Sequence, residues 1–182
     1  LWDGIKMYQS GHFFGLISAF NPYTTKKVNV SKNGTRARFG DGVSSVIDMQ
    51  LSDVIDGEFT AGIGSNLINA HGYAKIPLTH KTELQLSTRR SITDLIVTPT
   101  YDQYFKRVFQ DSDLSNNAKS DDIISQNEDF SFYDITAKLL YDISKKDKVR
   151  LHFMNINNSL NYEERSTIND RSEALNSSLS QQ

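Results

Sequence analysis

The chain has 182 residues, which is long enough for one domain with a sizeable core. Its net charge of −2 and its pI near 6.1 argue against nucleic-acid binding, which requires a clearly basic surface. It has no cysteine, which excludes disulfides, thiolate metal sites and a cysteine nucleophile. The first residue is Leu1 rather than Met, and we expect the chain to be a fragment of a larger protein.

Residues 1–52 are punctuated by glycine and predict a small mixed α/β unit of short strands. The apolar segment 12–20 is helical or extended and ends before Asn21-Pro22. Short strands are expected at residues 27–31, 36–39 and 43–49. The first two would be joined by Asn33-Gly34, a strong two-residue hairpin signal, and Val46 and Ile47 should be buried in the third.

From residue 56 the pattern changes to longer segments in which apolar and polar residues alternate. Apolar residues share one face at Phe59, Ala61 and Ile63, at the even positions from 68 to 76, and at Leu84 and Leu86. These segments predict three strands, with a short link at residues 77–81 between the second and the third. The alternation stops between residues 90 and 129, which predicts a long connector with a helical spacing of apolar residues near 101–109.

The segment 133–143 places apolar residues at every odd position, and the alternation resumes after the short polar turn 144–148. This predicts a long antiparallel hairpin whose strands match the nine to eleven residues of a tilted membrane-spanning strand. Tyr133 and Tyr141 lie on the apolar face, about 20 Å apart in height, where two aromatic girdles would be expected. A soluble sandwich, in which a second sheet covers the apolar face, is the alternative interpretation.

Loop lengths favour the membrane interpretation, because bacterial outer-membrane barrels have short periplasmic turns and longer external loops. If the turn at 144–148 is periplasmic, the connector at 90–129 is external and the link at 77–81 is periplasmic again. The first strand then leaves from the periplasmic side, as it must if residues 1–52 precede a barrel there. Negative mean hydropathy agrees with such a wall, because alternating strands average to a polar composition.

Six segments occur in a fixed order along the chain: WDGIK at 2–6, GHFFGL at 11–16, SAFNP at 18–22, ARFGDGVSSVID at 37–48, RRS at 89–91 and FYDITAKL at 132–139. In this ordered set the sequence resembles TonB-dependent outer-membrane receptors of the kind found in Bacteroidetes. It implies that residues 1–52 are the C-terminal half of a plug domain and residues 53–182 the first strands of a transmembrane β-barrel. The fold class is then mainly β, with a partial α/β plug.

The same resemblance implies a receptor in the cell outer membrane that imports an extracellular nutrient into the periplasm, energised by the TonB complex, with no catalysis and no cofactor. Its structural and gating residues would be those of the plug motifs: Asp3, Gly4, Gly11, His12, Gly15, Arg38, Gly40, Gly42 and Ser45. Gly40 and Gly42 would permit positive φ or close backbone approach, with ordinary turns as the alternative. A soluble β-rich ligand-binding module is the alternative function.

Inward-facing polar side chains of the hairpin would line the lumen as cross-strand charge pairs: Asp134, Lys138, Asp142 and Arg150. An exchange of Lys138 for Glu should then be mild, whereas Arg at lipid-facing Leu139 should cost about 2 to 4 kcal/mol. Tyr101, Tyr104 and Phe105 could contact a ligand from the external loop, or pack within it. The four histidines lack the close spacing of a zinc site, so no metal is expected.

Overall fold

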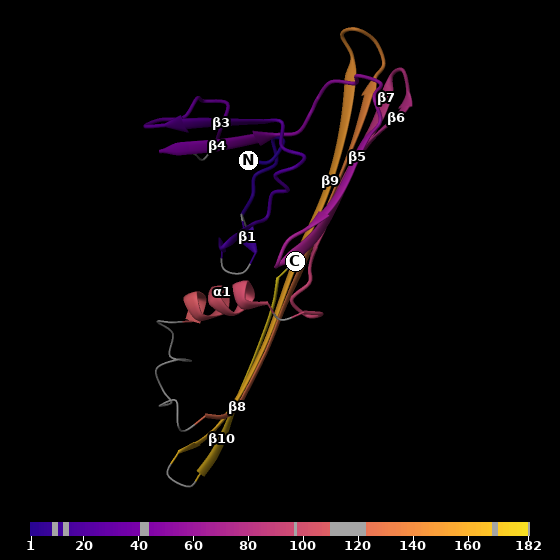
Figure 1. The fold of residues 1–182 in the computed structure, drawn as a ribbon. Coiled ribbons are helices and arrows are strands. Elements are labelled where there is room, and N and C mark those ends of the chain that lie inside the picture. The colour runs from indigo at the N-terminus through magenta and orange to yellow at the C-terminus, as the bar shows by residue number, and fades with distance from the viewer. Residues whose placement is uncertain are drawn as a thin grey trace.

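The computed structural model describes residues 1–8, 11–12, 15–40, 44–96, 98–109, 123–168 and 171–181. The fold is mainly β, with antiparallel sheets, as the sequence predicts. Its main element is a long six-stranded sheet of consecutive strands, in the order β10-β9-β8-β7-β6-β5 (Figure 1). The strands are β5 (Thr60–Ser65), β6 (Asn69–Thr79), β7 (Thr82–Ser91), β8 (Ile123–Asp142), β9 (Lys148–Ile168) and β10 (Arg171–Gln181).

Two strand boundaries and one whole strand of this sheet differ from the sequence prediction. The strand β8 begins at Ile123, so the predicted connector at 90–129 is too long at its C-terminal end. The predicted link at 77–81 belongs largely to β6, which continues through Pro77 to Thr79 with a register shift. The strand β10 was not predicted, because its polar, serine-rich sequence shows little alternation of apolar residues.

The N-terminal segment, residues 1–52, forms two small antiparallel ribbons. One pairs β1 (Gly11–His12) with β2 (Ile17–Ser18), and the other pairs β3 (Lys27–Lys32) with β4 (Ser45–Gln50). The predicted hairpin between 27–31 and 36–39 is wrong, because the partner of β3 is β4. Asn33 and Gly34 do turn the chain, with φ of 58° and 130°, but they open a longer connection.

Two further expectations for this segment are corrected by the structure. Its described residues contain short strands and no α-helix, so the expected α component is not found there. Val46 is only half-buried and Ile47, on the opposite face of β4, is exposed, because the β3–β4 ribbon extends away from the main sheet (Figure 1).

The main sheet has two chemically different faces. Along β8 every even-numbered side chain from Phe130 to Leu140 is buried, whereas Tyr133, Ile135 and Tyr141 are about 40% exposed. The N-terminal segment and the helix α1 (Pro99–Phe109) both lie on the side of the buried face (Figure 1). The apolar side chains of the middle of the sheet therefore point outward, away from the rest of the chain.

The polarity of the two faces reverses along β8 and β9. Level with Tyr133 and beyond it, the outward side chains of β9 are Asn157 and Ser159, and the buried face becomes apolar. A core cluster forms there under the helix α1, made of Ile68, Tyr101, Phe130, Phe132 and Leu160, with Ile17 and Tyr104 packed against it. The helix α1 therefore covers an ordinary apolar core, next to a part of the sheet with the opposite arrangement. No helix among the described residues is long and apolar enough to cross a membrane.

Candidate functional site

The N-terminal segment meets the sheet through two groups of charged side chains. We call the first the Asp134 cluster: Asp134 on β8, Arg89 on β7, His12 on β1 and Asn158 on β9. The Arg89 Nε donates to Asp134 Oδ2 at 2.8 Å, and a second guanidinium nitrogen donates to the Ser18 carbonyl at 2.7 Å. Both side chains are at least 95% buried. A charge pair removed from water in this way is stable only while both partners are present.

His12 is the contribution of the N-terminal segment to this cluster, and it is fully buried. Its Nδ1 lies 2.7 Å from Asn158 Oδ1 and its Nε2 lies 3.2 Å from Asp134 Oδ2, while the ring stacks on Phe132 with centroids 4.1 Å apart. Both ring nitrogens therefore face oxygen atoms of the sheet, and an imidazolium would donate to both. The stacking on Phe132 places the ring at the boundary between the polar and the apolar part of the buried face.

The second group, the Lys138 cluster, lies nearer the hairpin turns. The Lys138 ammonium is 3% exposed and contacts Asp3 Oδ2 at 2.6 Å and Asp53 Oδ1 at 3.1 Å. It also donates to the Ser52 carbonyl at 3.3 Å. One lysine of the sheet thus binds both ends of the N-terminal segment. These contacts lead us to expect a severe rather than a mild effect of Lys138→Glu, because a third carboxylate would lie beside Asp3 and Asp53.

Arg150 extends this cluster across β9. Its Nε donates to Asp53 Oδ1 at 3.0 Å, and a terminal nitrogen donates to Asp142 Oδ1 at 2.8 Å. Burial alone would raise the pKa of Asp53, but hydrogen bonds and positive charge from Lys138 and Arg150 outweigh it and hold that pKa below its usual value. Asp53 therefore remains ionised and continues to link the chain after residue 52 to the sheet.

An aromatic stack and a cavity lie between these elements on the β5 side. Gly62 and Gly64 of the edge strand β5 leave room for the rings of Tyr73 and His71, since a Cβ would stand 2.7 and 2.8 Å from them. Tyr23 of the N-terminal segment stacks on both rings, with centroids 6.3 and 4.2 Å away. The adjacent cavity has a volume of about 310 Å³ and is lined mainly by polar residues, including Lys75 and Gln85.

The predicted plug-motif residues separate into two places. Asp3, Gly4, Gly11, His12 and Gly15 lie where the N-terminal segment approaches the sheet. Gly4 and Gly15 have φ of 86° and 90°, values that favour glycine. A Cβ on Gly11 would lie 2.7 Å from Gly15 Cα, so no larger residue fits at position 11. Arg38, Gly40 and Ser45 lie instead on the exposed β3–β4 ribbon.

Gly40 has neither a positive φ nor a close neighbour among the described residues at its Cβ position, which supports the alternative of an ordinary turn. Gly42 lies outside the described residues. Tyr101 is 4% exposed and Tyr104 half-buried in the core under α1, which supports packing rather than ligand contact for these two residues. Phe105 belongs to the same helix, and its side chain lies outside the described part.

The predicted lumen-lining residues all point to the side of the N-terminal segment: Asp134, Lys138, Asp142 and Arg150. The sequence did not single out Arg89, Asn158 or Asp53 as their partners. Arg89 could have been found from the sequence, because in the alternation of β7 it lies on the polar face, level with Asp134. Among the described residues no group of three or more histidine, aspartate or glutamate side chains could hold a metal ion.

The chain was compared with models of known protein families, with curated proteins and with solved structures. None of the three comparisons found a match.

Proposed function

We propose that the chain is part of an outer-membrane receptor that binds an extracellular nutrient and imports it into the periplasm, energised through the TonB complex. In this proposal the six strands are part of the wall of a transmembrane β-barrel, and residues 1–52 are part of its plug. The observation that carries it is the orientation of the sheet, whose charged face is buried and whose apolar face points outward.

This orientation is the opposite of what a protein surrounded by water requires. Full burial of a large apolar side chain contributes about 1.5 to 3 kcal/mol, and here many such side chains are left outward. The most exposed of them on the strands are Ile63, Leu78, Leu151 and Phe153, all more than half exposed. Lipid acyl chains would cover this face without a second protein layer, as they do on the outside of membrane barrels.

The dimensions of the outward apolar region support the same proposal. It extends along β8 from Tyr133 to Tyr141, and the facing residues of β9 run from Asn157 to Val149. Eight residues at about 3.3 Å each and a tilt near 40° give roughly 20 Å of height, close to the apolar band of about 25 Å on known membrane barrels. Tyrosine at both margins fits the aromatic girdles of such bands.

The two clusters give the plug of this proposal its attachment to the wall. The Asp134 cluster holds the β1–β2 ribbon through His12, and the Lys138 cluster holds Asp3 near the start of the N-terminal segment and Asp53 directly after its end. Opening a path for a nutrient would require breaking at least one of them. Ion pairs suit this role because water entering the opening can solvate the separated charges.

The proposal is tested with two arginine substitutions on the same face of the sheet. Phe153 lies in the middle of the outward apolar band, opposite Ala137, and Asn157 lies at its margin, level with Tyr133. Refolding into lipid vesicles should cost about 2 to 4 kcal/mol for Phe153→Arg and about 0 to 1 kcal/mol for Asn157→Arg, because lipid penalises arginine most at the midplane. Equal costs for the two variants, or recovery of the intact protein in a soluble fraction of the cell, would contradict the proposal.

A further inference from the structure

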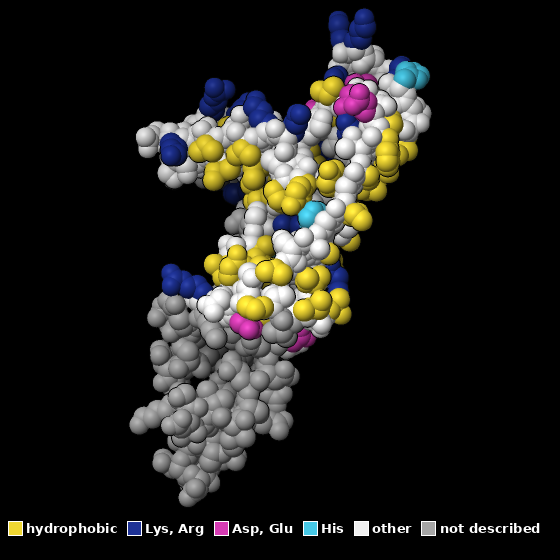
Figure 2. Space-filling view, viewed as in Figure 1, with side chains coloured by type: hydrophobic (Ala, Val, Ile, Leu, Met, Phe, Trp, Pro, Cys, Tyr) yellow, Lys and Arg dark blue, Asp and Glu magenta, His cyan; other side chains and the backbone are white. Residues whose placement is uncertain are grey.

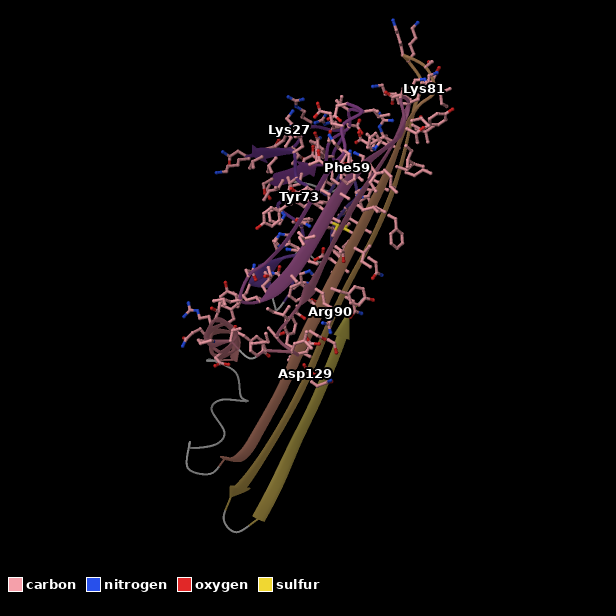
Figure 3. The ribbon with its side chains drawn as sticks, turned by 45° about the vertical axis from the view of Figure 1, so that its right-hand side comes forward. Lys27, Phe59, Tyr73, Lys81, Arg90 and Asp129 are labelled. Atoms are coloured by element: carbon pink, nitrogen blue, oxygen red, sulfur yellow. The ribbon has the colours of Figure 1, made fainter. Side chains whose placement is uncertain are left out.

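The two hairpin turns at one end of the sheet are joined into a single surface. The Asp142 backbone amide donates to the Lys81 carbonyl at 2.9 Å, and Lys81 Nζ donates to the Ile143 carbonyl at 3.1 Å. The β6–β7 turn and the β8–β9 turn are therefore held side by side, although they are separated by 62 positions along the chain. Lys81 marks this end of the sheet in Figure 3.

This surface, which we call the turn end, carries an excess of positive charge. Its exposed lysines are Lys81, Lys145, Lys146 and Lys148. Two carboxylates accompany them and leave the four lysines in excess: Asp142 binds Arg150 and lies 3.7 Å from the Lys148 ammonium, and Asp147 accepts a hydrogen bond from the Ser144 hydroxyl at 2.7 Å. The fully buried Glu83 does not reach the surface. Figure 2 shows Lys and Arg side chains extending beyond this end of the molecule.

The turn end directly adjoins the outward apolar face. Leu78, Tyr141, Ile143 and Val149 are 38 to 53% exposed and lie within a few residues of the lysines on the same hairpins. Figure 2 shows hydrophobic side chains continuing along the outer margin of the sheet up to this end. The long lysine side chains can thus follow the edge of the apolar face and keep their ammonium groups in the headgroup layer.

We propose that the turn end is a binding surface for the headgroups of anionic phospholipids. The lysine ammonium groups contact lipid phosphates, while Tyr141 and Leu78 lie at the boundary of the acyl chains. This inference rests on the proposed function, since it requires the apolar face to stand in lipid. It adds a preference for one lipid class and fixes this end of the wall at one membrane surface.

Exposed lysines on proteins are usually only solvated, and the position of these four distinguishes them from that case. The β3–β4 ribbon also carries exposed basic residues, Lys27 and Lys32 among them, but it lies on the covered side of the sheet, away from the apolar face (Figure 1). A membrane that covers the outward face would contact the turn end, which adjoins that face, and would not contact the ribbon. The ribbon therefore provides a control in which the same charge is removed elsewhere.

The test measures binding of the full chain to vesicles of phosphatidylcholine, with and without phosphatidylglycerol, by co-sedimentation at low and high salt. A lysine near an anionic surface strengthens binding by about fivefold, so phosphatidylglycerol should raise the affinity by at least about tenfold at low salt. The double variant Lys145→Gln, Lys146→Gln should lose most of this increase and keep its binding to phosphatidylcholine. The variant Lys27→Gln, Lys32→Gln should keep both, and high salt should remove the increase from the wild type.

The outcomes separate this inference from the proposed function. Binding to phosphatidylcholine without any increase from phosphatidylglycerol would overturn the lipid preference alone. An equal loss in the ribbon variant would also overturn it, because the effect would then belong to total charge rather than to the turn end. A chain that binds neither kind of vesicle would contradict the proposed function itself.

Discussion

Replacing Asp134 by asparagine should destabilise the folded chain more than the same replacement of Asp142, which lies at the C-terminal end of the same strand. The substitution keeps the shape of the side chain and removes its charge, which leaves the 95% buried Arg89 guanidinium with neutral acceptors only. Breaking a buried pair in this way costs about 3 to 5 kcal/mol. This is a large fraction of the total stability of a typical domain, about 5 to 15 kcal/mol.

The matched control is Asp142→Asn, also on the inward face of β8. Asp142 is 28% exposed, and its partner Arg150 retains Asp53, so the expected cost is less than about 1 kcal/mol. Denaturant titration followed by fluorescence of Trp2 measures both, because this buried residue is the only tryptophan and stacks on Phe20 in the N-terminal segment. Similar costs for the two variants would refute the reasoning.

A double-mutant cycle with Arg89→Met distinguishes an ion pair from simple packing. Removing both charges abolishes the unpaired partner that makes each single variant unstable, so the double variant should be more stable than the sum of the single effects predicts. The expected coupling energy is about 2 to 3 kcal/mol. Purely additive effects in the cycle would show that Arg89 and Asp134 do not depend on each other.

Three further outcomes are expected. Because Lys138 and Arg150 hold the pKa of Asp53 below its usual 3.8, its contribution to stability is present above that pH and is lost as the pH falls through the lower folded value. The stability advantage of the wild type over Asp53→Asn in urea titrations should therefore be constant above about pH 5 and shrink as the pH falls below it. Gly62→Ala should cost about 1 to 3 kcal/mol, because its Cβ would displace the Tyr73 ring that lies 2.7 Å away, whereas Gly72→Ala meets its nearest atom at 3.7 Å and should be nearly neutral in the same assay. Lys138→Glu should prevent docking of the N-terminal segment, measured as a shift of Trp2 emission toward that of an exposed indole, and unchanged emission would contradict the role of the Lys138 cluster.

The strands of the main sheet were predictable where one face is apolar and the other polar. In β7 and in β8 from residue 133 the alternation is nearly complete, and it identified both the strands and their faces. The same signal disappears in β10, whose serines and asparagines lie between single apolar residues, and in the first residues of β8. Pairing with β9 forms these strands, and a pairing partner cannot be identified from the local sequence of one strand.

The N-terminal segment was harder to predict for a different reason. Asn33 and Gly34 have the positive φ angles that asparagine and glycine adopt more readily than other residues, but the strand that pairs with β3 begins at Ser45 rather than Arg36. A turn signal determines local backbone geometry and does not determine how many residues pass before pairing resumes. The site had a similar limit: Asp134 and Lys138 were identified by their face, whereas their partners His12, Asp3 and Asp53 come from distant parts of the chain.

The reversal of polarity along β8 and β9 limits how far the strands could shift along the membrane normal. Arg90, Tyr133 and Asn157 lie at one level across three neighbouring strands (Arg90 is labelled in Figure 3), and Tyr141 and Val149 lie together at the opposite margin. A displacement of the wall by two residues toward one side would carry a guanidinium and a carboxamide into hydrocarbon, and a displacement toward the other would carry aliphatic side chains into water. If the strands stand in a bilayer as we propose, the chain alone therefore specifies its immersion depth to within about one pleat of the sheet.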